Sequence, residues 1–237
     1  MNEDWKAAID HLYAVFACYR RPSKLEASRT RDPVAILGDL TSAPLRALPA
    51  DKLGAYAGHA LTTVGSEGDY RHFLPRIIEL SAAPQNWMGL DPEHIAGKLN
   101  YAHWRHWPDD AQMAIVRAFN AAWRKARTDS PDLADASSQL CALAILGIDI
   151  APLLASWGAP ESGDEVRQMM AHVQAAISLA DPAYWKNAGQ ANCRALWRWA
   201  RSASLREAIE AQAALVPYES LWEIDRAFAE IETMPEA

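Results

Sequence analysis

The chain has 237 residues, of which 50% are hydrophobic and 22% charged, a composition typical of a folded globular protein. Its 23 basic and 30 acidic residues give a formal net charge of −7, which disfavours non-specific binding to nucleic acid or to anionic lipid. Because it has no run of 18 apolar residues, no signal-like N-terminus and only three scattered cysteines, we expect a cytoplasmic protein without a membrane span or a disulfide framework.

Helix patterns follow one another along the first quarter of the chain. Apolar residues within 3–19 recur at steps of three or four, which predicts an amphipathic helix. The basic stretch 20–31 is expected to be an exposed connection. Asp32-Pro33 then begins a short helix, since Asp suits the N-cap and Pro suits the first helical position. The next helix is expected over 50–64, followed by Gly65, which suits a left-handed helix end.

Residues 61–80, LTTVGSEGDYRHFLPRIIEL, are expected to form a helix–turn–helix corner. Pro75 would cost roughly 3 kcal/mol inside a helix. The segment could therefore be a helix that begins at Asp69 and kinks at Pro75, or a short turn over 70–73 followed by a helix from about Leu74. We favour the second alternative. The apolar spacing predicts burial of four side chains, and Arg76 is expected to pair with a nearby carboxylate. The four are Phe73, Leu74, Ile77 and Leu80.

The rest of the chain continues the same pattern. Asp91-Pro92 predicts a helix to about residue 105, and Pro108 predicts one to residue 127. The core face of that second helix is expected to hold Met113, Val116, Phe119 and Trp123. Ser130-Pro131 predicts a helix ending at Gly147. A short segment over 151–157 and helices over 164–179, 188–201, 204–215 and 218–231 follow, with 159–164 as the best linker candidate.

No alternating strand pattern competes with these helices. The predicted fold is therefore all-α, with about ten helices and roughly 65% helical residues, in a single domain over 1–237. Helix-start signals recur at unequal spacings, which disfavours a uniform repeat. We expect an irregular array of antiparallel helix pairs, between an α-solenoid and a multi-helical bundle.

Two segments gather His, Trp and Arg and could converge on a pocket between helices. His103 and His106 are three residues apart, so on a helix both could face one ligand. Tyr70, Arg76 and Trp104 would complete the lining. The HxxH spacing is weak without an acidic partner in register, so no metal site is assigned. This pocket is the basis of an alternative function, a small-ligand-binding or metal-binding protein or enzyme.

Motifs of enzymes are missing from the sequence, which has no GxSxG, P-loop, GxGxxG or CxxC. We therefore expect no enzymatic activity, no catalytic residue and no cofactor. Residues 194–199 alternate Arg with apolar or aromatic side chains, and Trp and Arg are enriched at protein-binding hot spots. A core role for Leu196 and Trp199 is the commoner explanation, and the acidic charge disfavours a stacking platform for nucleic acid.

Charge indicates where a protein partner would bind. Residues 111–237 hold 11 basic and 16 acidic side chains, so a basic partner would be steered to this half. The candidate partner-binding residues are Trp197, Glu219, Trp222 and Glu223.

The segment GSEGDYRHFLPRIIEL resembles one found in uncharacterised, all-helical bacterial proteins of about this size, which carry D-x-x-HFLPR-aliphatic-x-E-L on one helix. The resemblance covers 16–20 residues and implies an all-α fold and an association with toxin systems, including immunity proteins. The matching positions are Asp69, His72, Phe73, Leu74, Pro75, Arg76, Glu79 and Leu80. The leading hypothesis is a cytoplasmic, non-enzymatic protein-binding module, an immunity protein that covers the active site of a basic toxin domain. Nucleic acid and membrane are not expected as partners.

Overall fold

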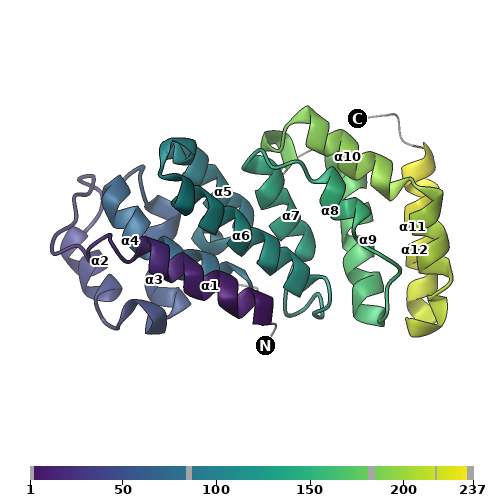
Figure 1. Cartoon of the computed structure of the whole chain (residues 1–237), viewed down its shortest axis with the longest axis horizontal. Helices are drawn as coiled ribbons and strands as arrows, with labels where there is room; N and C mark the ends of the chain where they lie inside the picture. Colours follow the sequence, from purple (N-terminus) through teal and green to yellow (C-terminus); the bar gives the residue numbers. More distant parts are fainter. Residues whose placement is uncertain (1–2, 84–86, 181–184, 217, 234–237) are drawn as a thin grey trace. The chain divides into compact units, whose positions relative to one another are not determined.

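The computed structural model describes residues 3–83, 87–180, 185–216 and 218–233 (Figure 1). It is 70% helical, and the described residues form twelve α-helices without a β-strand, so the predicted all-α, multi-helical fold is confirmed. None of the helices in these ranges is long and apolar enough to cross a membrane.

Contacts along the backbone divide the chain into two compact units, Met1–Ala122 and Trp123–Ala237. The boundary falls inside helix α6 (Asp109–Ala126), not at the linker candidate 159–164. Two such units can belong to one domain when a continuous helix joins them, so the single domain over 1–237 stays a prediction.

The first unit is organised around helix α4 (Glu67–Ser81), which packs against α1, α3 and α5. Beside α4 it contains α1 (Glu3–Phe16), α2 (Pro33–Leu40), α3 (Ala50–His59), α5 (Pro92–Tyr101) and the part of α6 up to Ala122, with 3-10 turns at Leu45–Ala47, Met88–Leu90 and Trp104–His106. Helix α2 begins as predicted, because the Asp32 side chain accepts from the backbone N–H groups of Val34 and Ala35.

Helix α4 runs through Pro75 without interruption, so the favoured prediction of a turn followed by a helix from Leu74 is wrong. A capping box at Ser66 and Asp69 stabilises the N-terminus of the helix. The Ser66 hydroxyl accepts from the Asp69 backbone N–H, and the Asp69 carboxylate accepts from the Ser66 N–H at 2.7 Å. Pro75 is buried with Phe73, Leu74 and Ile77, as predicted for those three, whereas Leu80 is only half-buried. Packing on three helices offsets the cost of an interior proline.

The chain before α4 turns earlier than the sequence indicates. Helix α3 ends at His59 instead of Val64, and Leu61 takes a positive φ of 68°. Gly65 has the left-handed conformation predicted for it, with a φ of 69°, and its N–H donates to the Glu26 carbonyl at 2.7 Å. Residues 60–65 thus form a loop, and backbone hydrogen bonds connect this loop to the basic stretch 20–31.

Arg76 has the carboxylate partner that the sequence predicts. Its Nη1 lies 2.7 Å from Glu79 Oε2, and its Nε donates to the Leu48 carbonyl at 2.9 Å. The same Glu79 oxygen accepts from the Tyr13 hydroxyl at 2.7 Å. Burial of the Tyr13 hydroxyl and, to a smaller extent, this hydrogen bond raise the pKa of Tyr13. The network joins α4 to α1 and to the Leu45–Ala47 turn, which gives Arg76 and Glu79 a structural role.

The turn Met88–Leu90 packs closely against α3 because two glycines meet there. A Cβ atom placed on Gly89 would lie 2.1 Å from the backbone nitrogen of Gly58. No side chain can fit at that distance without moving the backbone, so this contact needs glycine at position 89.

Helix α6 uses small residues for its core face. Ala111, Ala114, Ile115 and Ala118 are buried together with the predicted Phe119 and Trp123. The predictions for Met113 and Val116 are wrong, since Met113 is 65% exposed and Val116 is half-buried.

The second unit is organised around helix α9 (Gly163–Ile177), which packs against α7, α10 and α12. The unit also contains α7 (Ala136–Ile145), α8 (Ala151–Ala155), α10 (Gln190–Ala200), α11 (Ala203–Glu210) and α12 (Tyr218–Thr233). Helix α7 begins after Asp135, whose side chain accepts from the Ser138 N–H, so the predicted start at Ser130-Pro131 is wrong. Buried Gln168 of α9 holds that loop through hydrogen bonds to the Ala134 carbonyl at 2.8 Å and the Ala136 N–H at 3.2 Å.

Candidate partner-binding surface and aromatic cavity

Helix α12 presents a tryptophan to solvent on the side opposite its core face. Its buried residues Ile224, Ala227, Phe228 and Ile231 recur at helical spacing. Trp222 lies off this stripe and is 55% exposed. The guanidinium carbon of Arg226, one turn further on, lies 5.8 Å from the centre of the Trp222 ring. The ring of Trp222 is therefore available for contact without any change in the core.

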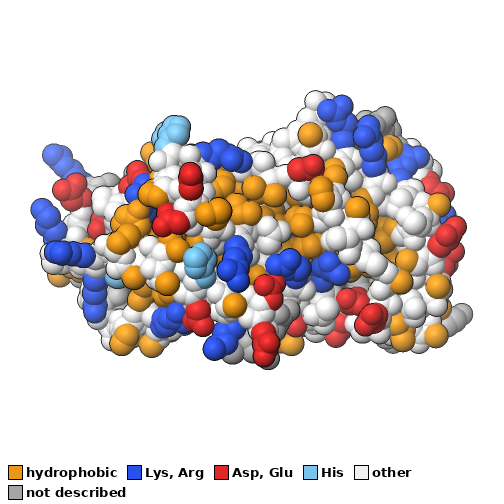
Figure 2. All heavy atoms as spheres, in the orientation of Figure 1, with side chains coloured by type: hydrophobic (Ala, Val, Ile, Leu, Met, Phe, Trp, Pro, Cys, Tyr) orange, Lys and Arg blue, Asp and Glu red, His pale blue; other side chains and the backbone are white. Residues whose placement is uncertain are grey.

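The surroundings of Trp222 are acidic. Residues 202–237 contain eight acidic and two basic side chains, a net charge of −6. One of the two bases, Arg206 of α11, is paired with Glu210 at 2.8 Å and with Glu232 of α12. In Figure 2, acidic side chains gather over α11 and α12, whereas Lys and Arg gather over α10. The α11–α12 face is thus suited to a positively charged partner.

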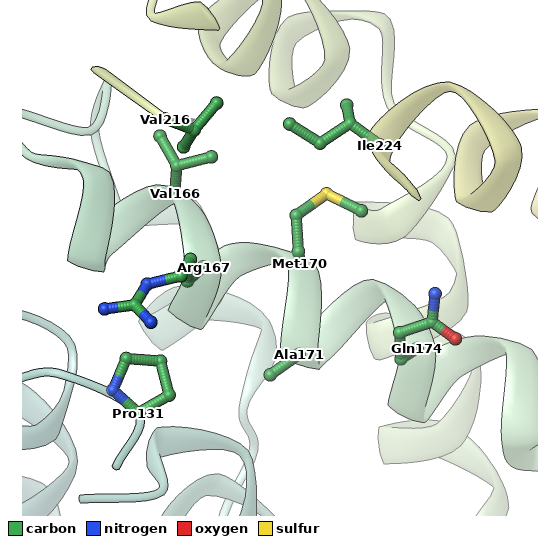
Figure 3. A pocket seen from close by; sticks show the side chains of 8 residues that line it. All are labelled: Pro131, Val166, Arg167, Met170, Ala171, Gln174, Val216 and Ile224. Atoms are coloured by element: carbon green, nitrogen blue, oxygen red, sulfur yellow. The ribbon is translucent and has the colours of Figure 1, made fainter. Parts of the chain in front are cut away.

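A groove of about 270 Å³ lies beside α9 and is closed on one side by Val216 and by Ile224 of α12. Figure 3 shows the Met170 side chain projecting from α9 toward Ile224. The remaining lining comes from Pro131, Val166, Arg167, Ala171 and Gln174. A flexible methionine in a largely apolar groove is well suited to contact an apolar side chain of varied shape.

The four residues predicted to bind a partner lie on two helices. Trp222, Glu219 and Glu223 belong to α12, but the side chains of Glu219 and Glu223 lie outside the described residues. Trp197 belongs to α10 and is half-buried, with the Arg201 guanidinium carbon 4.4 Å from its ring centre. The Trp222 ring is exposed, whereas the Trp197 ring is covered by Arg201.

A cluster of aromatic rings forms the interior of the second unit. Trp157 and Trp199 stack with ring centres 5.7 Å apart and planes 14° apart. Trp123 and His172 meet the Trp157 ring edge-on at 5.9 and 4.9 Å. The Arg127 guanidinium carbon lies 4.8 Å from the Trp123 ring centre and 4.9 Å from that of Trp157.

His172 is fully buried within this cluster. Its Nδ1 lies 2.7 Å from the Gln168 carbonyl, so Nδ1 carries the proton, and Nε2 has no hydrogen-bond partner among the described residues. Burial lowers the pKa of His172 to about 4, because the charged imidazolium would lose its hydration. His172 is therefore neutral at neutral pH.

A second cavity, of about 280 Å³, opens beside the stacked tryptophans. It is lined by Leu154, Ala155, Trp157, Gly158, Ala159, Met169, Trp199, Ser204, Leu205 and Ala208. No pattern in the sequence indicates this site. The spacing of Met169, His172, Val173 and Ala176 would have placed His172 on the buried face of α9, but nothing local shows that Trp157 and Trp199 meet.

The pocket predicted from the other His, Trp and Arg residues is not among these cavities. Tyr70 and Trp104 are buried core side chains, and the Trp104 Nε1–H donates to Asn100 Oδ1 at 3.0 Å. Arg76 is engaged with Leu48 and Glu79. His103 and His106 are exposed. Neither cavity described here is lined by any of the five predicted residues.

The two histidines are also not on one α-helix. Helix α5 ends at Tyr101 instead of Arg105, and His103 takes a left-handed φ of 50° before the 3-10 turn Trp104–His106. Their rings still stack, with centres 6.0 Å apart. Within the described ranges, no group of three His, Cys, Asp or Glu side chains is placed to hold a metal ion.

The two segments do converge, but through other residues. The Arg71 guanidinium carbon lies 4.2 Å from the Trp107 ring centre, and Arg71 Nη1 donates to the Tyr19 hydroxyl at 2.8 Å. Arg71 is also paired with Glu67. These contacts tie α4 to the turn Trp104–His106 and its flank, which is a structural arrangement.

Comparisons with known proteins do not assign a function. No family model matches the chain, and searches of curated proteins and of solved structures find no significant match.

Proposed function

We propose that this chain is a non-enzymatic protein-binding module that uses the α11–α12 face, centred on Trp222, to bind a basic protein. The observation that carries the proposal is a 55% exposed Trp beside Arg226 on a helix whose core face is already complete. Trp and Arg are the side chains most enriched at protein-binding hot spots. An exposed indole contributes little to the stability of the fold, so a binding role explains Trp222 better than a role in the core.

Charge supports the same surface. The net charge of −6 over residues 202–237 would accelerate association with a basic partner at low ionic strength. The groove at Met170 and Ile224 lies on the core side of α12, so it is not part of this surface. The exposed Trp222 ring would be the apolar anchor of the interface, and the acidic side chains would form its rim.

The specific partner that we propose is a bacterial toxin domain, which the chain would neutralise in the cytoplasm as an immunity protein. Two features support this choice. The segment 65–80 resembles that of helical proteins associated with toxin systems, and a basic nuclease-like toxin would complement the acidic α11–α12 face.

The test is co-expression of the chain with the toxin domain encoded beside its gene. We expect the wild-type chain to restore growth and to bind the purified toxin domain. Trp222→Ala should weaken binding at least about tenfold without changing the melting temperature, because the lost ring is exposed. Tyr101→Ala is the matched control, since it removes a 60% exposed ring from the first unit and should bind normally.

Two results would contradict the proposal. Failure of the wild-type chain to protect cells from that toxin would exclude the immunity function. Equal binding by Trp222→Ala and by the wild type would exclude the α11–α12 face as the contact surface.

The alternative proposal is reduced to metal-ion binding at His103 and His106, because Tyr70 and Trp104 are core side chains and Arg76 is paired with Glu79. The stacked, exposed rings of His103 and His106 are the observation in its favour. Metal analysis of the purified chain and of His103→Ala tests it. Equal metal content in the two proteins would remove the alternative.

A further inference from the structure

The cavity beside Trp157 and Trp199 is formed by four helices of the second unit. Trp157 follows the end of α8, Met169 lies on α9, Trp199 on α10, and Ser204, Leu205 and Ala208 on α11. Met169, Leu154 and Leu205 are buried, so their positions are fixed by the core. The walls of the cavity are therefore set by folding and lie outside the Trp222 surface.

The lining of this cavity contains no ionisable side chain. Among its polar groups are the Ser204 hydroxyl and the backbone at Gly158 and Ala159. The Trp157 ring already makes a cation–π contact with Arg127, whose guanidinium carbon lies 4.9 Å from the ring centre. A cationic ligand would approach that charge, and an anionic ligand would find no cation in the lining. The cavity therefore favours an uncharged ligand.

The stacked tryptophans also restrict how a ligand can lie. A ring inserted between two others needs roughly 9 Å between the outer centres, since each aromatic pair needs about 4.5 Å or more. The centres of Trp157 and Trp199 are 5.7 Å apart. A ligand must therefore contact the outside of the pair, where the half-buried Trp199 ring meets the cavity.

Volume sets the size of the ligand. At about 280 Å³, the cavity lies at the small end of ligand pockets and exceeds the roughly 150 Å³ known to hold benzene. We propose that this cavity binds a small uncharged aromatic molecule of one or two rings. Aromatic contact with Trp199 and apolar contact with Met169 and Leu205 provide the binding surface. This site does not depend on the proposed protein partner.

The test uses indole as the probe and the full chain as the protein. Calorimetric titration should show saturable binding of indole, and the side-chain N–H resonances of Trp157 and Trp199 should shift. Tryptamine and indole-3-acetate have the same ring system with a positive or a negative charge, and each should bind at least about tenfold more weakly than indole.

A pair of variants on α11 localises the site. Ala208→Phe fills the cavity from its wall and should raise the indole dissociation constant at least about tenfold. Glu207→Phe adds the same ring at the adjacent exposed position, outside the lining, and should leave binding within about twofold. Ser204→Leu, on the exposed rim one turn earlier, replaces Ala208→Phe if that variant does not fold.

Three outcomes would overturn the inference. These are no saturable binding up to the solubility limit of indole, equal affinity in Glu207→Phe and the cavity-filling variant, and tighter binding of either charged analogue.

Discussion

Replacement of His172 by Phe should remove a dependence of stability on pH that this one side chain introduces. Phe keeps a ring against Trp157 and Trp199 but cannot be protonated. The pKa of His172 is lowered by burial from 6.5 to about 4, so between these values the unfolded chain binds a proton that the folded chain does not. Stability must therefore fall as the pH is lowered through this window.

The magnitude follows from the two pKa values. The full shift corresponds to about 3 kcal/mol, since one pKa unit is about 1.4 kcal/mol. Of this, about 2 kcal/mol should already be lost between pH 7 and pH 5, where the unfolded histidine becomes charged. Carboxylates titrate in the same range in both proteins, so the informative quantity is the difference between wild type and His172→Phe.

The assay is urea unfolding at pH 5, 6 and 7, followed by tryptophan fluorescence, which reports on the rings around His172. We expect the free energy of unfolding of the wild type, relative to the variant, to decrease by about 2 kcal/mol from pH 7 to pH 5. A difference that stays constant within about 0.5 kcal/mol over this range would show that His172 is not a buried neutral group.

Four further substitutions, one of them a control, test the packing of the first unit by thermal and urea unfolding. Phe73→Ala should cost about 3–5 kcal/mol because the ring is fully buried, and an unchanged melting temperature would refute its place in the core. Gly89→Ala should be strongly destabilising because its Cβ would meet a backbone atom at 2.1 Å, whereas Gly97→Ala, with open space around it, should be neutral or slightly stabilising. Arg76→Ala should cost about 1–3 kcal/mol because it removes hydrogen bonds to a carboxylate and a backbone carbonyl, and no loss would show that this network is solvated.

Helix starts could be predicted where the stabilising contact is local. Asp32 caps α2 through N–H groups two and three residues away, so the sequence alone identifies it. Ser130-Pro131 has the same appearance, but residues 131–133 form a turn and the helix starts after Asp135. The deciding contacts come from Gln168, more than thirty residues away, which binds the backbone on both sides of that start. A local pattern cannot contain this information.

Incorrect predictions for residues inside helices have a similar cause. The cost of an interior proline favours a turn and a new helix from Leu74 over a helix kinked at Pro75, yet α4 packs on three neighbours and continues through Pro75. Met113 was expected in the core because it is large and apolar, but α6 buries alanines, which allow close approach of the backbone. Propensity and hydrophobicity rank residues one at a time, whereas packing selects the face that fits its neighbours.

The aromatic cavity could not be predicted from the sequence either, because it depends on contacts between segments that are far apart in the chain. Trp157, Met169, Trp199 and Ala208 are contributed by different elements, and no spacing along the chain relates them. The sequence pattern places His172 on the apolar face of its helix, but it does not indicate the contacts of His172 with two tryptophans. Trp222 is the opposite case, because the amphipathic pattern of α12 already separates it from the core stripe.

The tryptophans of this chain thus have separable roles. Trp104, Trp123 and Trp157 are buried, and each has an arginine over its ring, so an Arg–Trp pair in this sequence more often marks the core than a contact surface. The abundance of tryptophan is therefore not evidence for a binding function. Exposure is the discriminating property, and among the described residues only Trp222 and Trp87 have it, at 55% and 37%. Because Trp222 contributes little to the core, its loss should affect binding without affecting folding, which is the separation that the proposed function requires.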